Sequence, residues 1–158
     1  MIASIAFRKF KALRHTRVDL APFNLVIGPN GSGKTSMIEA LLRLRSLAAL
    51  PVSAEKFAQR VEGPEIEFRF EPPYGDIAVN LGCESDVVCD TLRIDPADAT
   101  GWPALREQLA SIRGYVLDQE AMAQAASRAT GVELRPDGGN LAAVLARLST
   151  AAPAAYAE

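Results

Sequence analysis

The chain has 158 residues, of which 49% are hydrophobic and 23% are charged. This composition is typical of one globular domain or lobe, and it excludes an intrinsically disordered chain. A membrane-spanning protein is excluded as well, because no run of about 18 apolar residues occurs. The formal net charge of -2 gives no whole-chain argument for binding nucleic acid or anionic lipid.

The first part of the chain predicts three strands. Residues 2–10 alternate loosely between apolar and polar side chains, and residues 17–20 predict a shorter second strand. Residues 23–27 (FNLVI) are a compact apolar run. Such a run is typical of a strand that is buried on both faces, as in a parallel sheet.

Residues 34–49 follow a glycine-rich loop and show helical periodicity. The expected apolar face consists of Met37, Leu41, Leu44 and Ala48, widened by Ile38. Glu39 and Arg43 are four residues apart, so we expect them to pair on the solvent-exposed face. Pro51 is expected to end the helix.

The pattern changes in residues 62–95, which predict antiparallel strands. Residues 65–70 alternate strictly, which is typical of a half-exposed strand. Two prolines and a glycine predict a turn at residues 72–75. Residues 77–81 and 87–94 predict two further strands, and the short turns imply a meander.

Residues 102–148 are predicted to be mainly helical. Helices are expected over residues 102–112 and 120–129, with a short strand at residues 115–117 between them. Residues 137–140 (DGGN) predict a turn and a helix cap.

A last helix is expected after that turn, because four apolar side chains share one face: Leu141, Val144, Leu145 and Leu148. The tail that follows carries no pattern. We therefore expect residues 1–148 to form one lobe and residues 149–158 to be a flexible tail.

The strongest motif is GPNGSGKT at residues 28–35, which matches the phosphate-loop pattern G-x-x-x-x-G-K-S/T. Backbone N–H groups of such a loop cradle a triphosphate, and glycine permits the backbone geometry that this needs. The following helix directs the positive end of its dipole at the phosphates. Lys34 is expected to reach the β- and γ-phosphates, and the Thr35 hydroxyl to bind Mg²⁺.

This motif predicts a site for ATP and Mg²⁺, with GTP as the other nucleotide to consider. The residues expected to bind the nucleotide are Gly28, Pro29, Asn30, Gly31, Ser32, Gly33, Lys34, Thr35 and Ser36. An Asn-Lys-x-Asp motif, which reads guanine, does not occur.

The residues around the loop narrow the family. I-x-x-x-x-F-K begins at Ile5, VDL at Val18, PFNLVIGPNGSGKTS at Pro22, and EAL at Glu39. This series resembles the start of ABC-type ATPases of the RecF, SMC and overcoming-lysogenization-defect branch, and of related bacterial AAA family ATPases. LRPDGGNLAAVL, beginning at Leu134, is similar to a later stretch of those bacterial proteins.

The resemblance implies an α/β fold. Its P-loop NTPase core would be like an ABC-ATPase head and would carry an antiparallel β-rich lobe. Such heads dimerise around two ATP molecules and serve DNA repair, chromosome organisation or phage defence. By the same resemblance, Lys11 and Arg14 lie near the nucleotide phosphates, Asn30 meets the γ-phosphate side, and Gln119 or Asp118 approaches Mg²⁺. A solvated turn is the other interpretation of Asp118 and Gln119.

The chain departs from this family in its hydrolytic half. ATP hydrolysis there also needs a strand ending in Asp-Glu and a Ser-Gly signature loop, and neither pattern is visible. The nearest candidate, YVLDQE at residues 115–120, has its two acids separated by Gln119. We therefore assign no catalytic residue and expect the N-terminal part of a longer ATPase, incomplete by itself. Its partner would be the missing C-terminal half or a second ATPase head, with DNA bound by the full assembly.

Two other functions remain open from the sequence. A complete small P-loop kinase fits the length, but two predicted strands precede the loop and an Arg-rich lid is not evident. A non-catalytic nucleotide-sensing module would bind ATP without hydrolysis, and the sequence does not distinguish it from an incomplete ATPase.

Several further residues have both a functional and a structural interpretation. The basic residues between Arg8 and Arg17 either touch DNA phosphates or form the exposed side of edge strands. Trp102 is expected to pack in the core. Cys83 and Cys89 lie in a chain without a secretory signal, which predicts two inert thiols in a reducing, cytoplasmic compartment.

Overall fold

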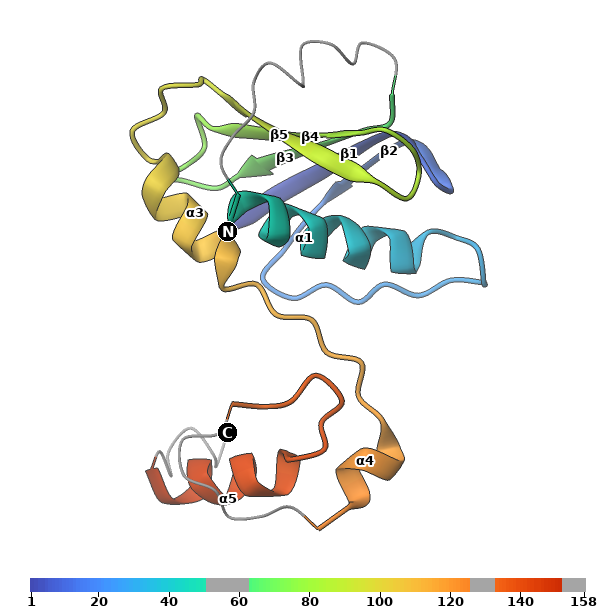
Figure 1. The fold of residues 1–158 in the computed structure, drawn as a ribbon, viewed down its shortest axis with the longest axis vertical. Helices are drawn as coiled ribbons and strands as arrows, with labels where there is room; N and C mark the ends of the chain where they lie inside the picture. Colours follow the sequence, from blue (N-terminus) through green and yellow to red (C-terminus); the bar gives the residue numbers. More distant parts are fainter. Residues whose placement is uncertain (51–62, 126–132, 152–158) are drawn as a thin grey trace. The chain divides into compact units, whose positions relative to one another are not determined.

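The computed structural model describes residues 1–50, 63–125 and 133–151. The chain divides into two compact units, Met1–Ile112 and Arg113–Glu158, which we call unit 1 and unit 2 (Figure 1). The division falls inside residues 1–148, which the sequence predicts to form one lobe.

Unit 1 is built on a five-stranded antiparallel sheet with the strand order β2-β1-β3-β4-β5. The strands are β1 (Ile2–Phe10), β2 (Leu13–Asp19), β3 (Glu65–Phe70), β4 (Ala78–Cys83) and β5 (Cys89–Asp95). The predicted meander is therefore present as β3-β4-β5. The second strand begins four residues before the predicted range of 17–20, because it forms a tight hairpin with β1.

The alternating pattern of the strands produces the core. In β3, Ile66, Phe68 and Phe70 are buried, while Arg69 between them is exposed. Antiparallel pairing sets Phe68 opposite Ile5 and Ile66 opposite Phe7, so these apolar side chains lie on the same face of the sheet. The result is one continuous layer of buried side chains facing the helices.

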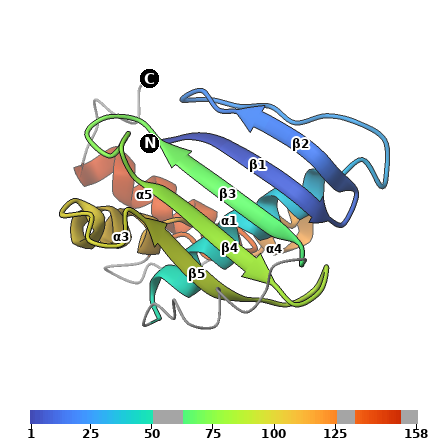
Figure 2. The same cartoon turned by 90° about the horizontal axis from the view of Figure 1, so that it is seen from above.

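The helices α1 (Lys34–Ala48) and α3 (Trp102–Ala110) lie together against one face of the sheet (Figure 1, Figure 2). Both agree with the sequence prediction to within two residues. Trp102 packs against the core, as expected.

The buried face of α1 differs from the predicted one. Its buried residues are Ser36, Ala40, Leu44 and Ala48. Ile38 is 53% exposed, and Met37 and Leu41 are only partly buried. Three of the four buried residues, Ser36, Ala40 and Ala48, have small side chains, and a prediction based on large apolar residues gives such positions too little weight. The predicted pairing of Glu39 with Arg43 is also wrong, because Glu39 contacts Lys11 instead.

Residues 23–27 do not form the predicted buried strand. Phe23 is 82% exposed and Ile27 is 81% exposed. The side chain of Asn24 accepts a hydrogen bond from the N–H of Ala21 and donates one to the carbonyl of Ala21, which turns the chain away after β2. Within the described residues, no strand pairs with this run, so the parallel sheet that the run predicted is not seen there.

The described part of unit 2 contains two helices, α4 (Gln119–Ala123) and α5 (Leu141–Ala151). The strand predicted at residues 115–117 is wrong: this segment is extended and is held by hydrogen bonds from the N–H of Val116 to Pro136 and from the N–H of Asp118 to Asp137. The predicted helix over residues 120–129 is confirmed only as the short α4, and residues 126–129 lie outside the described residues.

The turn at residues 137–140 is confirmed, with Gly138 in the left-handed region at a φ of 77°. The side chain of Asn140 accepts from the N–H of Arg135 and donates to the carbonyl of Glu133, so it holds the preceding loop rather than the helix end. Helix α5 continues to Ala151, three residues into the predicted tail.

A bidentate ion pair also links two segments of unit 2. Arg113 donates to both carboxylate oxygens of Glu133, at 2.5 and 2.8 Å. This contact lowers the pKa of Glu133 and raises that of Arg113. None of the α5 residues is buried within the structure, so the predicted apolar face of α5 stays open there.

Cys83 and Cys89 form a disulfide, so the prediction of two free thiols is wrong. The antiparallel register of β4 and β5 sets these residues opposite each other. A spacing of six residues does not reveal this pairing, because the pairing depends on where the hairpin turns. The inference from lone thiols to a reducing compartment therefore loses its basis.

Candidate functional site

The glycine-rich loop lies between the exposed residues 23–27 and the start of α1. Gly31 and Gly33 have φ values of 81° and 97°, in the left-handed region that favours glycine. Gly33 is the N-cap residue of α1, and it provides no side-chain cap. The first turn of α1 also contains no acidic residue. The positive end of the helix is therefore left open to an anion.

Lys34 folds back over this loop. Its Nζ donates to the carbonyl oxygens of Gly28 and Pro29, each at 2.8 Å. The loop is closed by a further hydrogen bond from the N–H of Ser32 to the carbonyl of Pro29, at 3.3 Å. These two contacts hold the ammonium group on neutral carbonyl oxygens of the loop. Neither of them is a contact with a carboxylate.

Thr35 and Ser36 point in different directions. Thr35 is exposed, so its hydroxyl is accessible to a metal ion that needs hard oxygen ligands. Ser36 is 7% exposed and lies on the buried stripe of α1. Its contact with a phosphate would therefore come from the backbone N–H and not from the hydroxyl.

The hairpin of β1 and β2 packs against the loop. A Cβ atom on Gly33 would lie 2.6 Å from Cδ2 of Leu13, so the Leu13 side chain already fills the space beside Gly33. Lys11, in the turn of this hairpin, pairs through its Nζ with Glu39 of α1. Arg14 is exposed on β2. The fold thus brings Lys11 to the helix that begins at the loop.

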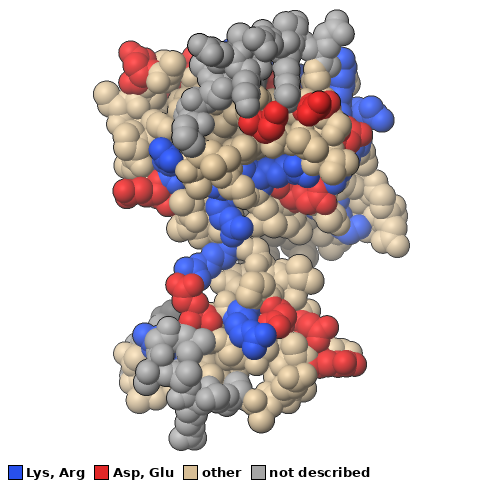
Figure 3. Space-filling model, viewed as in Figure 1, with Lys and Arg blue, Asp and Glu red and all other residues tan. Residues whose placement is uncertain are grey.

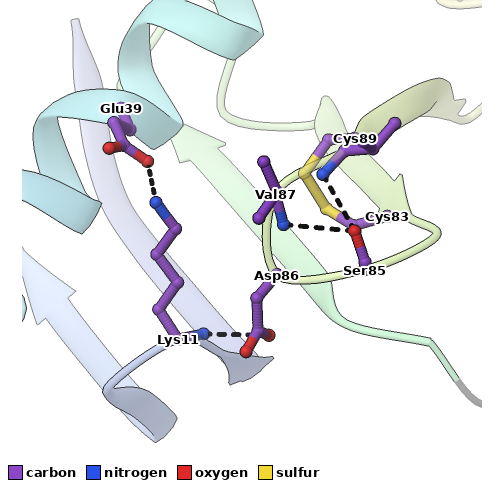
Figure 4. A network of polar contacts seen from close by, with 8 residues as sticks. Lys11, Glu39, Cys83, Ser85, Asp86, Val87 and Cys89 are labelled. Carbon is purple, nitrogen blue, oxygen red and sulfur yellow. Dashed lines mark hydrogen bonds and ion pairs between the residues drawn. A yellow bond between two sulfur atoms is a disulfide. The ribbon is translucent and has the colours of Figure 1, made fainter.

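Asp86 joins this region from the loop between β4 and β5. Its carboxylate accepts a hydrogen bond from the backbone N–H of Lys11 at 3.2 Å (Figure 4). The sequence did not single out Asp86 or this role of Glu39. Asp86 is 75 residues from Lys11, and no motif or period connects them.

The sequence profile of the AAA ATPase domain family matches residues 1–97, more than half of the chain. This chain belongs to the AAA ATPase domain family. It is also similar to two proteins described as "DNA replication and repair protein RecF". The one from Thermomicrobium roseum is 32% identical over 117 residues, which cover 72% of this chain and 29% of the relative. The one from Salinibacter ruber is 34% identical over 68 residues, covering 42% and 16%.

The resemblance to the RecF branch of AAA ATPases is thereby confirmed. The chain spans less than a third of the length of these two relatives. The family match covers the loop, α1 and the whole five-stranded sheet. It ends before α3 and before all of unit 2.

The two residues that the family resemblance placed near Mg²⁺ lie in unit 2. Asp118 is the N-cap of α4, and its carboxylate accepts the N–H of Ala121 at 2.8 Å. Gln119 is the first residue of that helix and is exposed. The role of Gln119 at the metal stays a prediction. Asp118 already has a structural function as a helix cap.

The basic residues of the hairpin are interspersed with carboxylates. Arg8 pairs with Glu65 at 3.2 Å, and Arg17 pairs with Asp19 at 3.0 Å. Both blue and red side chains occur on the visible face of unit 1 in Figure 3. This arrangement favours the interpretation of an exposed strand surface over a dedicated phosphate-binding patch for DNA.

The described residues hold no helix that could cross a lipid bilayer. They also hold no cluster of three or more His, Cys, Asp or Glu side chains suited to a metal ion.

Proposed function

We propose that this AAA ATPase family member binds Mg-ATP through residues 28–36. The observation that carries the proposal is the open start of α1. Two left-handed glycines, an uncapped helix N-terminus and the Lys34 ammonium converge on one loop. Each of these features favours an anion with several oxygens.

Each group in the loop has a distinct task in this proposal. Backbone N–H groups hold the phosphates, and Lys34 leaves its carbonyl partners to neutralise the β- and γ-phosphates. Thr35 provides an oxygen ligand for Mg²⁺. Asn30 lies on the γ-phosphate side, and Lys11 and Arg14 add positive charge from the neighbouring hairpin.

Hydrolysis by this chain alone is expected to be weak or absent. The nearest candidate for a catalytic acid, at residues 115–120, does not end a strand. Its Asp118 is engaged as the cap of α4. A non-catalytic nucleotide-sensing module is the second candidate function. The incomplete ATPase and the sensing module both require ATP binding, and neither requires this chain to activate water.

The exposed residues 23–27 suggest where further polypeptide joins. An apolar run that is this exposed has the composition of a central strand but no strand beside it in the described chain. A cavity of about 370 Å³ adjoins it at Asn24, and its lining includes Leu20, Leu41, Leu105 and Leu109. We propose that the rest of a longer ATPase, or a second head, covers this surface.

The comparisons favour the ATPase over a small kinase, since the family and the two relatives are ATPase-like or RecF proteins. A role in DNA repair, chromosome maintenance or phage defence is our proposal for the full assembly, with DNA as its substrate. The cytoplasmic location is likewise a proposal, and it rests on the use of ATP.

Binding of labelled ATP to Lys34→Ala tests the proposed site. Loss of a charge-assisted contact to phosphate should lower the ATP affinity roughly 10- to 100-fold. Arg69→Ala is the matched control, because Arg69 is an exposed cation of β3 outside the loop and outside the β1–β2 hairpin. Equal affinity of Lys34→Ala and the unmodified chain would show that the nucleotide binds elsewhere or not at all.

A further inference from the structure

We propose that Asp86 is a positioning residue for the nucleotide site and that it acts through Lys11. The proposal rests on the proposed function, because it assumes that Lys11 contributes positive charge to bound ATP. Asp86 itself touches only the backbone of Lys11 among its described contacts. Its effect on the nucleotide is therefore indirect.

The turn that carries Lys11 needs external support. Lys9 and Lys11 have φ values of 54° and 50°, although neither is glycine. A left-handed conformation is unfavourable for an L-residue, because its Cβ atom approaches the following carbonyl oxygen. Such a conformation persists only where the surroundings enforce it. Phe10, between the two lysines, is fully buried and stacks on Phe7, which fixes one side of the turn.

Asp86 fixes the other side. By accepting the N–H of Lys11, it holds the residue whose backbone is strained. The side chain of Lys11 then runs over the ring of Phe10, with its Nζ 5.8 Å from the ring centre, and reaches Glu39. Glu39 lies five positions after Lys34 on α1. Without the Asp86 contact, the turn can relax, and the ammonium loses its fixed place beside the helix.

The loop that presents Asp86 is itself well held (Figure 4). The Cys83–Cys89 disulfide closes its base. The N–H of Glu84 donates to the carbonyl of Val88 at 2.8 Å. Ser85 Oγ accepts from the N–H groups of Val87 and Val88 at 3.3 and 3.2 Å. A preorganised loop can impose its geometry on a strained turn, and this loop has the necessary internal contacts.

A double-mutant cycle with MgATP affinity as the readout tests the proposal. Asp86→Ala should lower the affinity roughly 2- to 10-fold, the range expected for the loss of one hydrogen bond. Asp86→Asn should retain nearly full affinity, because its side-chain carbonyl can still accept the Lys11 N–H. Lys11→Ala should lower the affinity, and adding Asp86→Ala to Lys11→Ala should cause no further loss.

A purely structural role for Asp86 gives a different pattern. Asp86→Ala would then lower the affinity equally in the unmodified chain and in the Lys11→Ala variant, and that result would overturn the proposal. Full affinity in Asp86→Ala, or in Lys11→Ala, would overturn it as well. Asp98→Ala is the matched control, since Asp98 is an exposed carboxylate in the loop before α3. If Asp86→Ala does not fold, Asp86→Glu replaces it, because its longer side chain displaces the carboxylate and predicts the same loss.

The outcome is separable from that of the proposed function. If the unmodified chain binds no ATP, the proposed function fails. If it binds ATP in a Lys34-dependent manner and Asp86→Ala binds equally well, only the role of Asp86 fails.

Discussion

Gly31 and Gly33 share a left-handed backbone but differ in their surroundings. A Cβ atom on Gly31 would meet no other atom within 4 Å. On Gly33 it would lie 2.6 Å from Cδ2 and 2.9 Å from Cγ of Leu13. The two glycines therefore separate the cost of the backbone conformation from the cost of close packing between the loop and the β1–β2 hairpin.

Gly31→Ala should destabilise the protein by about 1–2 kcal/mol, the cost of an L-residue in this conformation. Gly33→Ala should cost more, because the Leu13 side chain must also move. The measurement is urea-induced unfolding, and Leu13→Ala should recover part of the additional loss in Gly33→Ala. Equal costs for the two substitutions would show that the hairpin does not pack on the loop.

At the residue scale, the sequence predicts the roles of site residues that are close neighbours in the sequence. Gly31, Gly33 and Lys34 are fixed relative to each other by a short motif, so their spacing alone predicts their roles. Asp86 and Glu39 could not be found in this way. They meet Lys11 only after three separate elements have packed, and no local pattern records such a contact.

At the scale of elements, helix α1 links the loop to the core. Leu44 is fully buried under the sheet, whereas Ile38 on the same helix is 53% exposed. The sequence placed both residues on one apolar face. The structure separates them, because the buried stripe follows positions 36, 40, 44 and 48.

Leu44→Ala should therefore destabilise the protein by about 2–5 kcal/mol, as expected for a large core side chain. Ile38→Ala should change the stability by less than about 0.5 kcal/mol, which is typical of surface positions. Chemical denaturation of the two variants checks this difference. Comparable losses would contradict the packing of α1 and would favour the face predicted from the sequence.

The strand at residues 65–70 could be predicted from its strict alternation. Every second side chain of this strand points to the buried face of the sheet, and the sequence records that pattern. The exposure of residues 23–27 could not be predicted, because an apolar run becomes a buried strand only where neighbouring strands pair with it. The disulfide was missed for a related reason: Cys83 meets Cys89 through the register of β4 and β5, and the sequence does not fix that register.

At the scale of the whole molecule, the family match and the glycine loop both lie in unit 1. That unit has its own sheet, its own helix layer and the open start of α1. Unit 2 carries Gln119, whose predicted place at Mg²⁺ stays a prediction. The proposed function therefore depends on one property of unit 1, the binding of Mg-ATP by residues 28–36.

A titration of the ¹⁵N-labelled chain with MgATP, followed by NMR, tests this claim most directly. We expect saturable shifts that centre on the backbone N–H groups of residue 28 and residues 30–36, with smaller shifts at Lys11 and Arg14, and little change in β5 or α3. The same titration of Lys34→Ala should require much more ATP. An unmodified chain that shows no saturable shift, or shifts clustered away from the loop, would contradict the account.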